Sequence, residues 1–194
     1  MINIVMRLLA AVALAFAAIG ASAQPAEVEG VKLEPTAQVG GAALVLNGAG
    51  VRTRAIFKVY VAGLYVPAKA NSAAALLAQK GPRRVAITML RNVDADDFAG
   101  ALTEGLQKNH SDAQLAAFKA QIAALSASVK AAGEAKKGDV IHLEFAPDAG
   151  TRVVINGKPS GAAIPGEDFY TAVLRIWLGD KPVDSDLKKG LVGA

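Results

Sequence analysis

The segment Phe57–Val66 constrains the fold more than any other part of this sequence. It reads FKVYVAGLYV, and its second half is apolar on both faces. Successive strand residues point to opposite faces, so a strand that is apolar on both is covered on both sides. The whole run Val51–Val66, rich in β-branched and aromatic residues, therefore predicts a central strand of a sheet. Gly63 inside it indicates a bend, a bulge or a close approach.

The rest of the chain alternates between strand and helix patterns. Strands are expected over residues 31–34, 42–46, 84–91, 140–145 and 151–155. Helices are expected over 72–80, from 94 onward, from 111 to about 133, over 168–178 and over 185–191. Asn47-Gly48 and Asn156-Gly157 predict tight turns because these residues supply positive φ values. The element order predicts an α+β fold with a mostly antiparallel sheet, preceded by a loose arm over residues 24–30.

The first 23 residues have the pattern of a secretory signal peptide. Arg7 precedes an apolar run over residues 8–19, and Ala21-Ser22-Ala23 is a small-x-small cleavage signal. The alternative is a membrane anchor, but twelve apolar residues are too few to span about 30 Å of hydrocarbon. We expect cleavage after Ala23, secretion across the inner membrane, and a periplasmic product with no transmembrane span.

Composition excludes several classes of function. The 194 residues include no cysteine, which rules out disulfide scaffolds, thiol catalysis and cysteine-ligated metals. The only histidines are His110 and His142, and neither has visible partners, so we expect no metal and no cofactor. The net charge is +4, but basic residues occur only singly or in pairs, so no nucleic-acid partner is expected. The oligomeric state is left open.

Two motifs contain residues that are common in functional sites but have a structural explanation here. Asp94, Asp96 and Asp97 stand at a helix start, where the positive end of the helix dipole explains them. The run Gly48-Ala49-Gly50 is not a phosphate loop, because the lysine and the Ser/Thr that should follow are absent.

Arg52 and Arg54 are the candidates for binding chemistry. They lie near the start of the predicted central strand, next to its apolar continuation. Arginine keeps its charge in any environment, and its forked donors fit a carboxylate. An arginine at the edge of an apolar cleft can therefore anchor an acidic head group. The alternative is that both are solvated residues at a strand edge.

The residues from Asn47 to Arg52, followed by Lys58–Val66, resemble the signature stretch of the chalcone isomerase-like superfamily. Residues 91–98 resemble the strand-to-helix joint of that family, and residues 172–174, 178–179 and 183–188 resemble its C-terminal helices. The resemblance implies one α+β domain over residues 31–194. In that fold, helices cover one face of a large, mostly antiparallel sheet, and a ligand cleft lies between them.

The resemblance also implies where a site should lie. Active members of the family close a chalcone to a flavanone, using an arginine to hold the phenolate and a polar network to polarise the ketone. The arginine is retained as Arg52, but the network positions hold Tyr60, Met89, Phe98, Gly105 and Ile176. Losing one preorganised donor to a developing oxyanion costs about 2.7–4 kcal/mol. We therefore expect little or no catalysis.

Three functions follow for this sequence. The preferred one is a non-catalytic, exported protein that binds a small apolar carboxylate such as a fatty acid. In it, Arg52 and Tyr60 grip the carboxylate, and Met89, Phe98 and Ile176 line the cleft. The alternatives are an intramolecular lyase or isomerase of an enone-like substrate, with Arg52 as its catalytic residue, and a structural or interaction protein of the envelope.

One geometric condition applies to the preferred function. Arg52 and Tyr60 are eight residues apart, which is about 26 Å on a straight strand. They can share one cleft only if the chain turns between them.

Overall fold

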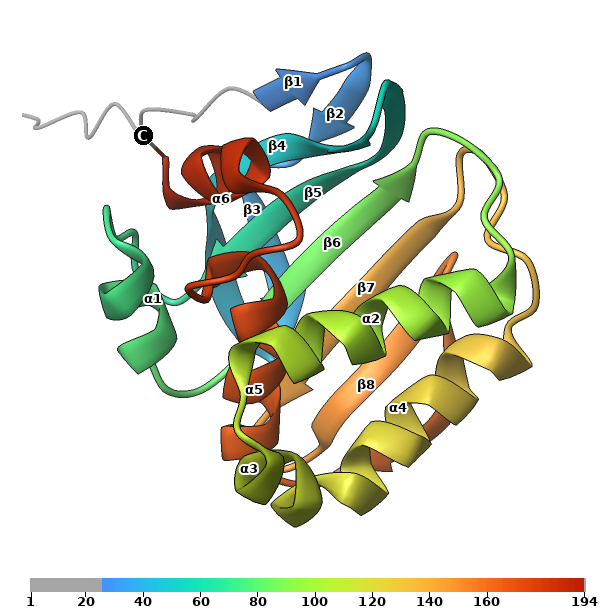
Figure 1. Ribbon diagram of the computed structural model, residues 1–194. Helices are drawn as coiled ribbons and strands as arrows, with labels where there is room; N and C mark the ends of the chain where they lie inside the picture. Colours follow the sequence, from blue (N-terminus) through green and yellow to red (C-terminus); the bar gives the residue numbers. More distant parts are fainter. Residues whose placement is uncertain (1–25, 194) are drawn as a thin grey trace, which may run out of the picture.

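A seven-stranded antiparallel sheet forms the centre of the molecule (Figure 1). The computed structural model describes residues 26–193, so the expected signal peptide lies outside the described residues. Each strand pairs with the next in sequence, in the order β3-β4-β5-β6-β7-β8-β9. The strands are β3 (Thr36–Val39), β4 (Ala42–Arg54), β5 (Phe57–Val66), β6 (Arg83–Met89), β7 (Val140–Ala146), β8 (Gly150–Ile155) and β9 (Lys158–Ile164).

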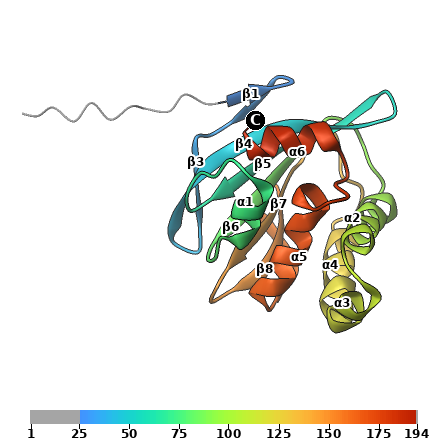
Figure 2. The ribbon, with the colours of Figure 1, turned by 60° about the vertical axis from the view of Figure 1, so that its left-hand side comes forward.

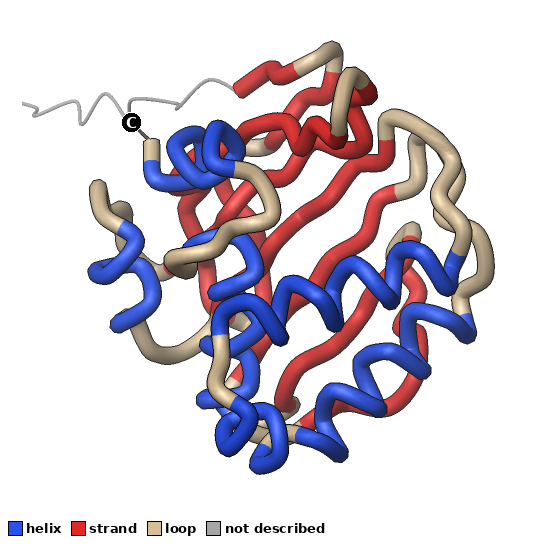
Figure 3. The backbone as a smooth tube through the Cα atoms, viewed as in Figure 1, coloured by secondary structure: helices blue, strands red, loops and turns tan. Residues whose placement is uncertain are grey.

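The helices gather on one face of this sheet (Figures 1 and 3). They are α1 (Ala73–Ala78), α2 (Ala95–Asn109), α3 (Asp112–Ala117), α4 (Lys119–Ala131), α5 (Glu167–Leu178) and α6 (Ser185–Val192). Ser72, Asp94, Ser111 and Asp184 cap α1, α2, α3 and α6 with side-chain oxygens that accept backbone N–H groups. This arrangement confirms the expected α+β class and the antiparallel sheet covered on one face by helices.

The strand β5 is the central strand that the sequence predicts. Every residue from Val59 to Val66 is buried. Ala62 and Leu64 belong to the core between the sheet and the helices, whereas Val61 and Tyr65 belong to a smaller cluster on the other face. Gly63 marks a close approach, because a Cβ there would collide with Leu33 of β2 (Val31–Leu33).

The turn between β4 and β5 lies elsewhere than the sequence indicates. β4 continues through Asn47-Gly48 with only a bulge, and the chain reverses at Ala55 and Ile56. The Asn47 side chain instead donates to the carbonyl of Leu191 at 2.8 Å, and its Oδ1 accepts from the backbone N–H of Ala70. The prediction of a turn at Asn47 and of a single strand over residues 51–66 is therefore wrong.

Four other elements differ from the expected pattern, and one of them is β3, a strand over residues 36–39 that the sequence did not indicate. Residues 26–28 of the expected arm form β1 (Ala26–Val28), which pairs with β2 in a two-stranded sheet. The helix expected from residue 111 to about 133 is divided into α3 and α4 at Phe118, whose ring packs 5.7 Å from that of Phe169. The edge strand β9 has no alternating apolar pattern in its sequence, KPSGAAI, so periodicity could not identify it.

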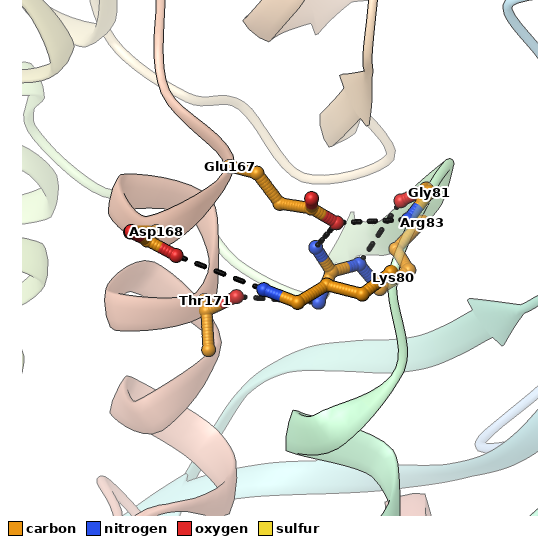
Figure 4. A network of polar contacts seen from close by, with 6 residues as sticks. All are labelled: Lys80, Gly81, Arg83, Glu167, Asp168 and Thr171. Atoms are coloured by element: carbon orange, nitrogen blue, oxygen red, sulfur yellow. Dashed lines mark hydrogen bonds and ion pairs between the residues drawn. The ribbon is translucent and has the colours of Figure 1, made fainter.

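A buried ion pair fastens α5 to the start of β6 (Figure 4). Arg83 has no solvent exposure, and its guanidinium donates to Glu167 at 2.9 Å, to Thr171 at 3.3 Å and to the carbonyl of Gly81 at 3.1 Å. The same Glu167 oxygen, Oε1, also accepts the backbone N–H of Gly81 at 2.8 Å. This network fixes the helix layer against the sheet.

Candidate functional site

Arg52 and Tyr60 face each other across the β4–β5 hairpin. They are register partners, and the guanidinium carbon of Arg52 lies 5.5 Å from the centre of the Tyr60 ring. The turn at Ala55 and Ile56 brings them together, so the geometric condition on a shared site is met. A cation over an aromatic face is attracted by the ring quadrupole, which holds the guanidinium in place.

Tyr60 is buried beneath this arginine, with an exposed fraction of 3%. The Trp177 Nε1–H of α5 donates a hydrogen bond of 2.9 Å to its hydroxyl oxygen. Burial raises the pKa of Tyr60 above its ordinary value, although the nearby Arg52 charge opposes this. The hydroxyl is therefore neutral at physiological pH and can donate a proton in a hydrogen bond but cannot act as a base.

Arg52 itself is half-buried, and one of its hydrogen-bond donors has no partner in the described part of the chain. Its Nε is buried and has no hydrogen-bond partner within residues 26–193. Buried donors of this kind are rare, since an unpaired polar group costs free energy. The Nε is enclosed by the protein, so the part of the side chain that a ligand can reach is the rest of the guanidinium, which lines two cavities.

Asp184 is a carboxylate that influences Arg52. It caps α6 and also accepts the N–H of Thr53 on β4 at 2.8 Å. Burial opposes its charge, but backbone N–H groups of Leu187, Thr53 and Asp186, together with the Arg52 charge, keep its pKa below the ordinary value. Asp184 therefore stays ionised and connects the α5–α6 segment to the hairpin.

Two cavities meet at Arg52. The larger, of about 480 Å³, is mostly polar and lies between the hairpin, α2 and the segment before α6, where Pro182 and Val183 line it. The smaller, of about 340 Å³, has mixed walls, which are apolar at Val59, Phe98 and Ala101 and charged at Arg52, Arg54, Arg91, Asp94 and Asp97. Both volumes fall within the range of about 300–1,000 Å³ that small-molecule sites occupy.

The predicted lining residues converge in space, but most lie deeper than the cavities. Met89 is the register partner of Tyr60, and Ile176 packs where a Cβ on Gly105 would collide with it. Each of these side chains has an exposed fraction of 1% and belongs to the core. Of the predicted apolar residues, Phe98 lines the smaller cavity, with an exposed fraction of 3%.

Arg91 is a site residue that sequence reasoning did not single out. It follows β6, lines the smaller cavity with Arg52 and Arg54, and lies with its guanidinium carbon 4.7 Å from the centre of the Phe57 ring. Its position between a predicted strand and a predicted helix was the one sequence feature that pointed to Arg91. That feature identifies a site residue only when the β4–β5 turn is placed correctly, because the turn brings Phe57 next to Arg91.

The described residues offer no obvious place for a metal and no spanning helix. Among residues 26–193, no group of three or more His, Asp or Glu side chains lies close enough together to hold a metal ion. Within the same residues, every helix is too short or too polar to cross a bilayer.

The comparison with known families decides the identity of the fold. Residues 25–193 match the model of the chalcone isomerase-like family. The chain belongs to the chalcone isomerase-like family. No curated protein matches this family member in sequence. Among solved structures, it is similar to the fatty-acid binding protein AtFAP1 of Arabidopsis thaliana, with a TM-score of 0.62 and 15% identity.

That similarity extends over 84% of this chalcone isomerase-like chain and 92% of the plant protein. At this level of identity the likeness concerns the fold. The family match and the shared fold confirm the resemblance that the Arg52 and Lys58–Val66 segments indicate.

Proposed function

We propose that this chalcone isomerase-like protein binds an apolar carboxylate, such as a fatty acid, without transforming it. Arg52 anchors the carboxylate, and the alkyl chain lies in the cavity of about 340 Å³ against Val59, Phe98 and Ala101. The Arg52 guanidinium, which lines this cavity and pairs with no carboxylate among residues 26–193, is the observation that carries the proposal.

The energetics favour binding through these two components. A hydrogen bond between a charged arginine and a carboxylate contributes about 1.5–3 kcal/mol when water is excluded. Each methylene removed from water adds about 0.8 kcal/mol. The Tyr60 ring supports the guanidinium from below, so little side-chain freedom is lost when the ligand binds.

Catalysis is not part of the proposal because most positions at which the family resemblance places the ketone-polarising network hold apolar, buried side chains. Met89 and Ile176 are apolar and buried in the core, and Phe98 is also buried. The Tyr60 hydroxyl already accepts from Trp177 and has a raised pKa, so it is unsuited to proton abstraction.

Two further observations support the proposed setting. The plant protein of similar fold is a fatty-acid binding protein, which gives a precedent for this ligand class on the fold. The leader pattern of residues 1–23 supports export, with cleavage after Ala23 and action in the periplasm.

Calorimetric titration of the delipidated protein with laurate and palmitate tests the proposal. We expect binding by the wild type and a loss of affinity of about tenfold to a hundredfold in Arg52→Ala. Arg152→Ala is the matched control, because Arg152 is an exposed arginine on β8. It should leave the affinity unchanged.

Two other experimental results would favour one of the alternative functions instead. Turnover of naringenin chalcone that disappears in Arg52→Ala would identify a lyase. Absence of both turnover and fatty-acid binding, with a folded protein, would favour the structural or interaction role.

A Tyr60→Phe variant separates the two roles of Tyr60. The aromatic ring remains under Arg52, but the hydroxyl is lost and Trp177 Nε1 is left without its acceptor. Because the ring does the supporting, we expect fatty-acid affinity within a few-fold of the wild type together with a lower stability of about 1–3 kcal/mol. An affinity loss as large as that of Arg52→Ala would show that the hydroxyl contacts the carboxylate.

A further inference from the structure

The tip of the β4–β5 hairpin carries an apolar surface that the binding site does not explain. Ile56 and Phe57 have exposed fractions of 85% and 53%, and they are the only exposed large apolar side chains among residues 26–193. They are adjacent in sequence and lie at the turn. Figure 2 shows this hairpin projecting beyond the sheet and the helix layer.

The conformation of the turn keeps these side chains at the apex. Arg54 pairs with Phe57 in register, so the chain reverses in two residues. Ala55 adopts a φ of 54°, in the left-handed region that is unfavourable for a residue with a Cβ. A tight reversal of this kind leaves Ile56 almost fully exposed, and Phe57 is covered in part by the Arg91 side chain.

Cations surround the apolar apex. Arg54 and Lys58 flank it on the two strands, and Arg91 lies over the Phe57 ring. Lys58 is paired with Glu29 at 2.7 Å, whereas Arg54 and Arg91 form no ion pair with any described residue.

Acidic residues lie close to the hairpin but not within the apex, and one of them, Glu29, pairs with Lys58. Asp94 and Asp97 face the cavity from the start of α2, and Asp94 is engaged as the helix cap. The apex itself, residues 54–58, contains two cations and no acid.

We propose that this tip, Arg54–Lys58 with Arg91, docks on the surface of an anionic phospholipid bilayer. Ile56 and Phe57 enter the boundary between head groups and acyl chains, while Arg54 and Arg91 contact lipid phosphates. Long cationic side chains beside apolar ones suit this boundary, because their charged ends reach the head groups while their stems stay apolar.

The size of the tip favours a lipid surface over a protein partner. A stable protein interface buries about 800 Å² on each side, whereas this patch consists of two apolar side chains on a convex turn. A bilayer accepts a small apolar wedge, and each nearby cation adds about fivefold to the affinity for an anionic surface.

Docking would also place the site close to the lipid. Ala55 and Phe57 line the smaller cavity together with Arg52, so the mouth of that cavity opens at the docked tip. The docking proposal rests on the exposed tip and its cations, and it stands whether or not the cavity binds a fatty acid.

Fluorescence of a Phe57→Trp variant tests the contact directly. The indole introduced there is exposed, whereas the native Trp177 is buried in the core. With vesicles of equal parts phosphatidylglycerol and phosphatidylcholine, we expect a blue shift and quenching by brominated acyl chains. The wild type, which reports Trp177 alone, should show neither.

Vesicle co-sedimentation provides the second measurement, with intact mass confirming that all preparations begin at the same residue. We expect Ile56→Ser combined with Phe57→Ser to weaken binding at least tenfold, and Arg54→Ala to weaken it about fivefold. Binding should fall with added salt and on pure phosphatidylcholine, because exposed charges are screened. Arg152→Ala, far along the sheet on β8, should bind as the wild type does.

Three results would overturn the proposal. The first is an indole at position 57 that is neither shifted nor quenched by anionic vesicles. The second is equal binding by the tip variants and the wild type. The third is a wild-type dimer that the Ile56→Ser, Phe57→Ser variant converts to monomers without any effect of vesicles, which would assign the tip to self-association. Thermal denaturation of each variant shows that the fold is retained.

Discussion

Arg83 is the most deeply buried charge that the structure describes. Its guanidinium carbon lies 5.8 Å from the ring centre of Phe145 and 5.4 Å from that of Tyr170. The rings bury the guanidinium, while the Glu167 side chain keeps an exposed fraction of 28%, so the pair is screened less than a surface pair but is not enclosed. This single side chain joins strand, helix and core.

Truncating this residue should be costly. We expect Arg83→Ala to lower the free energy of unfolding by about 2–4 kcal/mol, because it removes the buried guanidinium with its hydrogen bonds to Glu167, Thr171 and Gly81 and leaves a cavity. Urea denaturation measures the change. Lys80→Ala is the control, since Lys80 pairs with Asp168 at 3.7 Å in solvent and should cost less than about 1 kcal/mol. Equal effects of the two variants would contradict the structural role of Arg83.

His142 makes stability depend on pH. It lies half-buried on β7, and burial, with the nearby Arg84 charge, lowers its pKa to about 4 although Glu144 opposes the shift. An unfolded histidine titrates near 6.5, so between pH 6.5 and 4 only the unfolded chain takes up this proton. Stability should therefore fall as the pH drops through this interval.

A His142→Gln variant isolates this contribution from that of the carboxylates. We expect its stability loss between pH 7 and pH 4 to be smaller than that of the wild type by about 1–2 kcal/mol, after allowing for solvent screening. Urea denaturation at both pH values measures the difference. The same slope in both proteins would show that His142 is protonated in the folded state.

At the scale of elements, α6 lies directly on the backbone of β4. A Cβ on Gly48 would collide with the carbonyl of Gly190, and a Cβ on Gly190 would come within 2.5 Å of the carbonyl of Ala49. Glycines on both elements therefore let helix and strand approach without side chains between them. This contact, rather than a turn, accounts for the Gly48-Ala49-Gly50 motif.

Adding a side chain at this contact should push the two elements apart. We expect Gly48→Val to lower the free energy of unfolding by about 1–3 kcal/mol, because the helix must shift to avoid overpacking. Gly100→Ala is the opposite case: a Cβ there meets nothing within 4 Å, and alanine favours the helix α2 by about 0.5–1 kcal/mol. Thermal denaturation should move the two variants in opposite directions.

The success of sequence reasoning also differs between elements. The helix start at Asp94 and the Asn156-Gly157 turn are local signals, and the structure contains each where expected. The β4–β5 turn was missed because Ala55 and Ile56 carry no turn signature and the strain at Ala55 is supported by the pairing around it. Asn47-Gly48 resembles a turn sequence, but these two residues are instead required by the contact between β4 and α6.

In the candidate site, too, features that depend on neighbouring residues in the sequence could be predicted, whereas features that depend on the packing of distant segments could not. Arg52 and its neighbourhood were recognisable from the charged residues beside an apolar run. The burial of Met89 and Ile176 behind the cavities was not, because it depends on how closely α2 and α5 pack on the sheet. The bond between Trp177 and Tyr60 joins residues 117 positions apart and has no local signal.

At the scale of the whole molecule, stability is expected to be graded from the centre of the sheet to its margins. β5, β6 and β7 are paired on both sides and covered by the main core, whereas β1 and β2 form a separate two-stranded sheet. Backbone amides open least often where burial and pairing are continuous. In hydrogen exchange measured by mass spectrometry, peptides from β5–β7 should therefore exchange orders of magnitude more slowly than those from β1–β2. Similar rates in both would contradict this gradation.

The pairing of Arg52 with Tyr60 across one short hairpin has a consequence for engineering. If the protein binds a fatty acid as proposed, the residues that recognise the carboxylate lie in a single continuous stretch of chain, whereas the cavity beside them is lined by α2 and by the segment after β6. Under that proposal, substitutions at Val93 or Ala101 alter which alkyl lengths fit and leave Arg52 in place. Chain-length preference and charge preference become separate design variables in this scaffold.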